Sequence, residues 1–168
     1  MTDQAIATAD MSDSMDAGEE RLKGSDFLSF DLAHELYGVD IKAVEEIRVW
    51  ETPTAIPRAP EFILGVINLR GMIVPIMDLR VRFNIGKIEY LPTTVVLILK
   101  SSDHVGGRMM GVVVDAVSDV IDMGDNSLMP PIGDSEVMPF VSGLLNVDAQ
   151  VMSLLDVDSL LNIEALVH

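Results

Sequence analysis

Residue types that could carry catalysis are present, but they do not form a catalytic arrangement. The three histidines, His34, His104 and His168, are scattered along the chain, and there is no cysteine. His34 and Glu35 begin like the zinc-binding motif His-Glu-x-x-His, but Gly38 stands where the second histidine is needed. The chain has no glycine-rich phosphate loop and no serine elbow. The sequence therefore predicts a protein that is not an enzyme and has no cofactor.

One group of carboxylates could suggest a cation site: Asp115, Asp119, Asp122 and Asp125. Their spacing matches no calcium-binding loop, and the distal glutamate that such a loop requires is missing. We interpret them as a solvated acidic surface and expect no bound metal. An acidic metal-dependent enzyme is the alternative, and tight binding of a divalent cation at these residues would support it.

Two opposite charges could hold loops together. Glu46 follows a segment that reads as a buried strand, and Arg70 lies at the tip of an expected hairpin. An arginine can bind a carboxylate in a bidentate pair, but the residues alone leave open whether these two meet or are unrelated surface charges. Nearby, Ile41, Val44 and Ile47 recur at the helical spacing i, i+3, i+6, which is typical of a core face and also fits an exposed groove.

Size and charge exclude several function classes. The 168 residues and 18.3 kDa correspond to about one domain, and 27 acidic against 11 basic residues give a net charge of −16. This charge repels nucleic acids and anionic lipid surfaces. No apolar stretch approaches the roughly 20 residues of a membrane-spanning helix, and no signal peptide is recognisable. We expect a cytoplasmic protein with no direct membrane insertion.

The elements that would position these residues are mostly short strands. Apolar runs and alternations between turn residues predict the strands: 27–32, 36–41, 65–69, 72–77, 94–99, 109–114, 141–147 and 151–155. Short helices are expected near 59–64, 79–83 and 157–166. Residues 1–24 hold six acids, two bases and no aromatic side chain, which predicts a disordered acidic tail.

An internal repeat organises these elements. A shift of 78 residues places Phe62, Gly65, Asn68 and Asp78 on Phe140, Gly143, Asn146 and Asp156, and a shift of 73 places Gly38, Val44 and Glu46 on Gly111, Val117 and Asp119. Matched glycine, asparagine and aspartate positions are set by turn geometry more than by hydrophobicity. We expect two tandem β-units, about 27–90 and 93–163, that pack together and leave a groove at their junction.

The same segments resemble the CheW-type chemotaxis coupling proteins of bacterial sensory arrays. The matching blocks are GVDI at 38–41, VEEIR at 44–48, IP at 56–57, GVINLRG at 65–71, IVPIMDLR at 73–80 and GVVVDAVSDV at 111–120. The resemblance covers residues 26–164. It implies a mostly β CheW-like domain over 25–164, built as two tandem five-stranded SH3-like β-barrels around a shared hydrophobic junction.

The resemblance also implies partners and contact residues. The expected partners are the regulatory domain of the histidine kinase CheA and the cytoplasmic domain of methyl-accepting chemoreceptors, in chemotaxis or in a non-motility chemosensory array. The residues implied for receptor binding are Leu28, Ile41, Val44, Glu46, Ile47, Arg70 and Val117. Those implied for kinase binding are Ile56, Pro57 and Phe83. Glu46 and Arg70 match a functionally sensitive pair of the family, so we expect them to be in contact.

Overall fold

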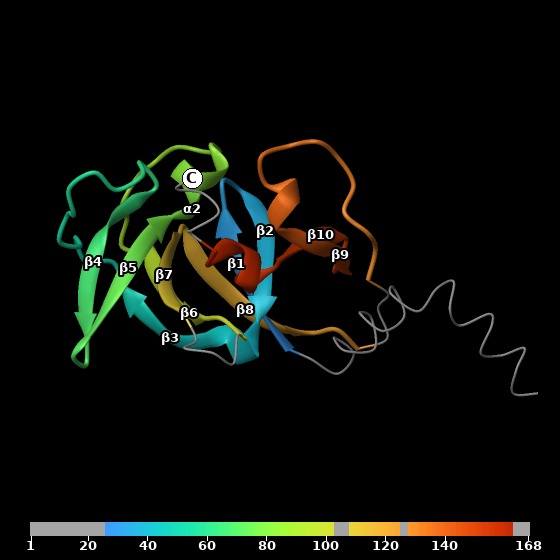
Figure 1. Ribbon diagram of the computed structural model, residues 1–168. Coiled ribbons are helices and arrows are strands. Elements are labelled where there is room, and N and C mark those ends of the chain that lie inside the picture. The colour runs from blue at the N-terminus through green and yellow to red at the C-terminus, as the bar shows by residue number, and fades with distance from the viewer. Residues whose placement is uncertain (1–25, 103–107, 125–127, 163–168) are drawn as a thin grey trace, which may run out of the picture.

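The computed structural model describes residues 26–102, 108–124 and 128–162. Its strands form two five-stranded sheets, which lie side by side in Figure 1. Sheet 1 has the order β8 (Ala116–Asp122), β1 (Asp26–Leu32), β2 (Glu35–Asp40), β10 (Gln150–Leu155), β9 (Val141–Val147). Sheet 2 has the order β3 (Val44–Val49), β6 (Val95–Lys100), β7 (Met109–Val114), β5 (Met72–Asp78), β4 (Ile63–Leu69). The short helices are η1 (Ile41–Ala43), α2 (Leu79–Phe83), η2 (Met138–Phe140) and α3 (Val157–Leu160).

The predicted fold class is confirmed, and so are the eight predicted strands and the helix at 79–83. The helix expected near 59–64 is wrong, because residues 61 and 62 form a turn and β4 begins at Ile63. The C-terminal helix covers Val157–Leu160, so its predicted continuation over residues 161 and 162 is wrong. Residues 163–166 of that prediction lie outside the described residues, as does the predicted tail. No helix among the described residues is long and apolar enough to cross a bilayer.

Two strands, β3 and β8, escaped prediction because they are edge strands rich in charge. Each lies at the end of its sheet order. Their sequences, VEEIRV and AVSDVID, place charged residues among the apolar ones, and neither strand has a fully buried side chain. Charged edge strands are a common protection against sheet-to-sheet aggregation, and they lack the continuous apolar signal of the central strands.

The hydrophobic core has three parts, and the largest is shared by both sheets. It joins Leu28 and Phe30 of sheet 1 to Leu97, Leu99 and other residues of sheet 2. Each sheet also covers a core of its own on its other face. The central strands are therefore buried on both faces, which explains the unbroken apolar run at 95–99: Leu97 and Leu99 face the shared core, and residues 96 and 98 face the core of sheet 2.

The sheets do not follow the two halves of the chain. Sheet 1 takes β1 and β2 from the first half and β8, β9 and β10 from the second, whereas sheet 2 takes β3, β4 and β5 from the first half and β6 and β7 from the second. The expected barrel units 27–90 and 93–163 are therefore wrong as descriptions of the two sheets. The chain crosses between sheets after β2 and again after β7, so each half contributes to both.

The internal repeat itself is present in three dimensions. Asp78 donates its backbone N–H to the carbonyl of Phe62 at 2.9 Å, and Asp156 donates to Phe140 at 2.7 Å. The same two aspartates accept from the first turns of α2 and α3 and so cap both helices. A Cβ at Gly65 would collide with the backbone carbonyl of Thr54, which pairs with Val66 of β4, and a Cβ at its repeat partner Gly143 would collide with the side chain of Leu128. Repeat-related positions therefore have the same structural role.

A buried ion network joins the two sheets where the chain crosses from β7 to β8. The side chain of Arg80 in α2 is 1% exposed and donates two hydrogen bonds to Asp78, at 3.0 and 2.9 Å. Its Nη1 donates to Asp115 at 2.9 Å and to the carbonyl of Glu89 at 2.7 Å. The second oxygen of Asp115 accepts the N–H of Ala33, in the β1–β2 turn, at 2.8 Å. Arg80 thus ties a helix of sheet 2 to a hairpin of sheet 1.

We predict that Arg80→Met destabilises the protein by about 3–5 kcal/mol, because the 0% exposed carboxylate of Asp78 would be left without its counter-charge. Chemical denaturation measures this loss. Lys87→Met is the control, since Lys87 forms an ion pair with Glu89 but its side chain is 84% exposed, and it should stay near wild-type stability. Equal stability of the two variants would contradict a structural role for the buried network.

Candidate functional site

Glu46 is the centre of a three-residue ion cluster. Its Oε1 accepts a hydrogen bond from Nη1 of Arg70 at 2.8 Å, so the expected contact between these residues is present. The expected bidentate geometry is wrong, because Oε2 of Glu46 instead accepts from Nη1 of Arg48 at 2.7 Å. Glu46 therefore bridges two arginines. Arg48 was not among the predicted site residues, although its i+2 spacing from Glu46 on a strand would have pointed to it.

Local structure explains why these charges meet. Glu46 and Arg48 lie on one face of β3, since alternate side chains of a strand share a face. Arg70 sits in the turn between β4 and β5 with φ +50°, and Gly71 follows with φ +87°. The Asn68 side chain fixes this turn by accepting the Gly71 N–H at 2.8 Å. The hydrogen bonds from Arg70 and then Arg48 lower the pKa of Glu46 below its ordinary value.

The apolar residues of β3 share a face, but not through a helix. Val44 and Ile47 lie opposite Leu99 and Leu97 of β6, with a β-bulge between Val44 and Glu46. In a regular strand, residues three apart point to opposite faces. The bulge adds one residue and brings both to the face that carries the shared core. The helical interpretation of this spacing is therefore wrong, while the prediction of a common face is correct.

β8 repeats this arrangement in sheet 1. Val117 and Val120 lie opposite Phe30 and Leu28 of β1, again with an irregularity in the register between them. These positions are the 73-residue repeat partners of Val44 and Ile47. We call Val44, Ile47, Val117 and Val120 the apolar strip. Val120 was missed, although applying the repeat to Ile47 would have found it.

Exposure increases outward along the apolar strip. Ile41, Val44 and Val117 are partly buried against the shared core, whereas Ile47 is 47% and Val120 is 50% exposed. The strip can therefore present aliphatic side chains to a partner without losing the core beneath it.

Two predicted contact residues are not accessible. Leu28 is 3% exposed and Phe83 is 1% exposed, and both belong to the shared core. The structure contradicts direct partner contact for them. Ile56, at 42% exposure, and Pro57 are exposed in the connection between β3 and β4.

The acidic residues are not one surface. Asp115 belongs to the Arg80 network, Asp119 and Asp122 lie on β8, and Asp125 is outside the described residues. Among the residues that the structure describes, no group of three His, Cys, Asp or Glu side chains is placed to hold a metal ion.

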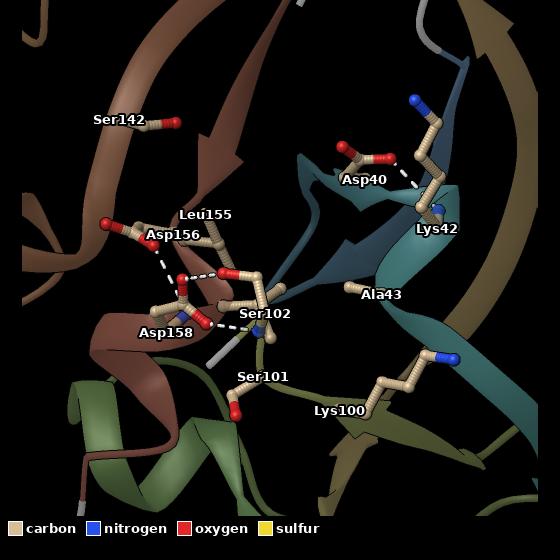
Figure 2. Close-up of a pocket in the computed structure, with 11 residues that line it drawn as sticks. Asp40, Lys42, Ala43, Lys100, Ser101, Ser102, Ser142, Leu155, Asp156 and Asp158 are labelled. Carbon is tan, nitrogen blue, oxygen red and sulfur yellow. Dashed lines mark hydrogen bonds between the residues drawn. The ribbon is translucent and has the colours of Figure 1, made fainter. Parts of the chain in front are cut away.

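A polar cavity of about 450 Å³ lies where η1, the end of β6 and α3 meet (Figure 2). Lys42 and Lys100 line one side, and Asp158 lines the other. Both oxygens of Asp158 accept hydrogen bonds from Ser102, at 2.8 Å from its N–H and 2.6 Å from its hydroxyl. No residue of the apolar strip lines this cavity.

We predict that the pKa of Glu46 rises toward its ordinary value in Arg70→Met and, by a smaller amount, in Arg48→Met, because Arg70 contributes the larger lowering. Carboxyl NMR titration measures both changes. Because the folded pKa is lowered, the Glu46 contacts contribute above the ordinary pKa and are lost as pH falls through the folded value. An unchanged Glu46 pKa in both variants would contradict the bridged geometry.

The chain is similar to known chemotaxis proteins in both sequence and structure. Residues 26–165 match the family model of the CheW-like domain. The chemotaxis protein CheW of Klebsiella aerogenes is 40% identical over 143 residues, covering 84% of each chain, and that of Rhizobium meliloti is 33% identical over 138 residues, covering 81% of this chain and 86% of the relative.

A solved structure shows the same fold. The scaffolding protein TtCheW from Thermoanaerobacter tengcongensis superposes with a TM-score of 0.71 at 37% identity, covering 79% of this chain and 84% of that one. The two five-stranded sheets fit the double-barrel description. The chain therefore belongs to the family of CheW-like proteins and is a non-catalytic chemotaxis scaffold protein.

Proposed function

We propose that the protein links the cytoplasmic domain of chemoreceptors to the regulatory domain of the histidine kinase CheA, in the cytoplasm beneath the receptor array. The observation that carries this proposal is the apolar strip on the two strands that follow the sheet crossings, with an exposed arginine near one of them. Because the protein itself catalyses nothing, its effect is to change the activity of the kinase when both partners are bound.

The apolar strip is the proposed receptor surface. A helix docks through aliphatic residues on one face, and a row of partly exposed valine and isoleucine side chains is complementary to it. Ile41 lies beside the strip, packed against the same core. Leu28 is buried and lies opposite Val120 on the neighbouring strand β1, so its role is to support Val120 and not to contact the receptor.

The ion cluster is a polar contact site on the other face of β3 from the apolar strip, since Glu46 and Arg48 lie opposite residues 98 and 96 of β6. Arg70 uses Nη1 on Glu46, and its side chain is 66% exposed, so the rest of its guanidinium can meet a partner carboxylate. Arg48 binds the other oxygen of Glu46. Arg70 therefore makes one hydrogen bond to Glu46 and not a bidentate pair. Glu46 then positions Arg70, while Arg70 contacts the receptor.

The proposed kinase surface contains Ile56 and Pro57. Both lie in the connection that reaches β4, where Thr54 pairs with Val66 through two backbone hydrogen bonds of 2.9 and 2.8 Å. This pairing holds the connection against sheet 2, so the exposed side chains have a fixed position. Phe83 has no part in this surface, because it is buried.

We predict that Ile47→Arg and Val120→Arg each weaken binding of a receptor cytoplasmic fragment at least about tenfold, or ~1.4 kcal/mol, because a guanidinium would be buried without a partner. Titration calorimetry measures the affinity. Val151→Arg, on 52% exposed Val151 of β10, is the matched control. Cooperative melts near the wild type in all three variants exclude misfolding. Wild-type receptor affinity in both strip variants would overturn the proposed surface.

We predict that Ile56→Arg weakens binding of the CheA regulatory domain while leaving receptor affinity unchanged, since Ile56 lies outside the strip. Binding of each isolated partner and kinase phosphorylation with receptor present are the measurements. Ile47→Arg should show the reverse pattern. Loss of both partners in Ile56→Arg, with the fold intact, would contradict separate surfaces, and equal kinase regulation with and without the protein would contradict the linking function.

A further inference from the structure

Under the repeat, β3 and β8 carry similar aliphatic residues at the two positions of the apolar strip and unlike residues at a third position. Val44 corresponds to Val117 and Ile47 to Val120, but the partner of Val49 under the same 73-residue shift is Asp122. Val49 is 72% exposed, and Asp122 is exposed. The difference therefore lies at the outer end of each strand.

Both residues of this unequal pair lie on the face that carries the apolar strip. Val49 is opposite Val95, two residues along β6 from the partner of Ile47. Asp122 is opposite Asp26, two residues along β1 from the partner of Val120. Since directly opposite residues share a face and alternate residues keep it, Val49 extends the strip on β3, and Asp122 ends it on β8.

The charges around the two ends also differ. At the end of β3, on the opposite face from Val49, Arg48 and the exposed Arg70 share the carboxylate of Glu46. At the other end, two like charges, Asp26 and Asp122, face each other across the β1–β8 pair, an arrangement that repels unless a cation lies between or above them. Among the described residues, neither of these two carboxylates has an ion-pair partner within 4.0 Å.

A surface with true two-fold symmetry would accept a helix in two opposite directions with equal energy. We infer that Val49 and Asp122 remove this degeneracy and fix the direction in which the partner helix lies. This inference rests on the proposed function. The helix places an aliphatic residue over Val49 and a lysine or arginine over Asp122 and Asp26.

The binding test uses a purified receptor cytoplasmic fragment and the full chain. Asp122→Lys should weaken binding at least about tenfold more than Asp134→Lys, which makes the same change in net charge at an exposed residue outside the strip, and the difference should shrink with salt. Val49→Asp should weaken binding about fivefold more than Val151→Asp, at another exposed valine. Equal affinities within either pair would overturn the inference.

The direction itself can be measured by spin labelling, because the chain has no native cysteine. Glu45→Cys and Ser118→Cys place labels at exposed positions that correspond under the repeat. With a second label at one end of the receptor helix, each should give a single distance distribution in the wild-type background and two distributions in Asp122→Val. Two distributions in the wild-type background would overturn the inference.

These results separate the two proposals. If Ile47→Arg and Val120→Arg leave binding intact, the proposed receptor surface fails, and the orientation inference fails with it. If both weaken binding while Asp122→Lys behaves like Asp134→Lys, the receptor surface stands and only the orientation inference fails.

Discussion

The arrangement of the two sheets depends on the hydrogen bonds and ion pairs of the buried guanidinium of Arg80. A charge at 1% exposure is costly unless all its donors are satisfied, and here Asp78, Asp115 and the carbonyl of Glu89 accept from it. Burial lowers the pKa of Arg80, but the hydrogen bonds and charges of Asp78 and Asp115 outweigh it and raise the pKa overall. Asp115 sits where the chain leaves β7 for β8, so this network holds a sheet crossing in place.

The crossings create the proposed binding surface. β3 follows β2 of sheet 1 but pairs in sheet 2, and β8 follows β7 of sheet 2 but pairs in sheet 1. The two strands come from opposite halves of the chain, and Val44 of β3 and Val117 of β8 both pack against the one shared core. The bulges in β3 and β8 then turn pairs of aliphatic residues three apart onto the core-facing side. The apolar strip therefore arises because each half of the chain contributes strands to both sheets.

The burial of neighbouring residues separates those that stabilise the core from those that a partner can contact. Leu28 and Phe83 are held in the core and are not accessible to a partner. Val44 and Val117 are partly buried and connect that core to the surface, while Ile47, Val120 and Arg70 are exposed enough to be contacted. Stability and recognition therefore rest on adjacent layers of the same strands.

The sequence by itself determined the strands with strong apolar runs, the repeat with its matched aspartates, and the contact between Glu46 and Arg70, because these depend on local patterns or on a match of motifs. Tertiary structure alone decided which strands share a sheet, since hydrogen-bond partners in a sheet come from distant segments. It also decided that Phe83 is buried and that Asp115 is an internal hydrogen-bond acceptor for Arg80. The bulge in β3 explains why the helical interpretation of Val44 and Ile47 is wrong. Residues three apart share a face in a helix but not in a regular strand. Only the register against β6 shows that an inserted residue puts these two side chains on the same face of the strand.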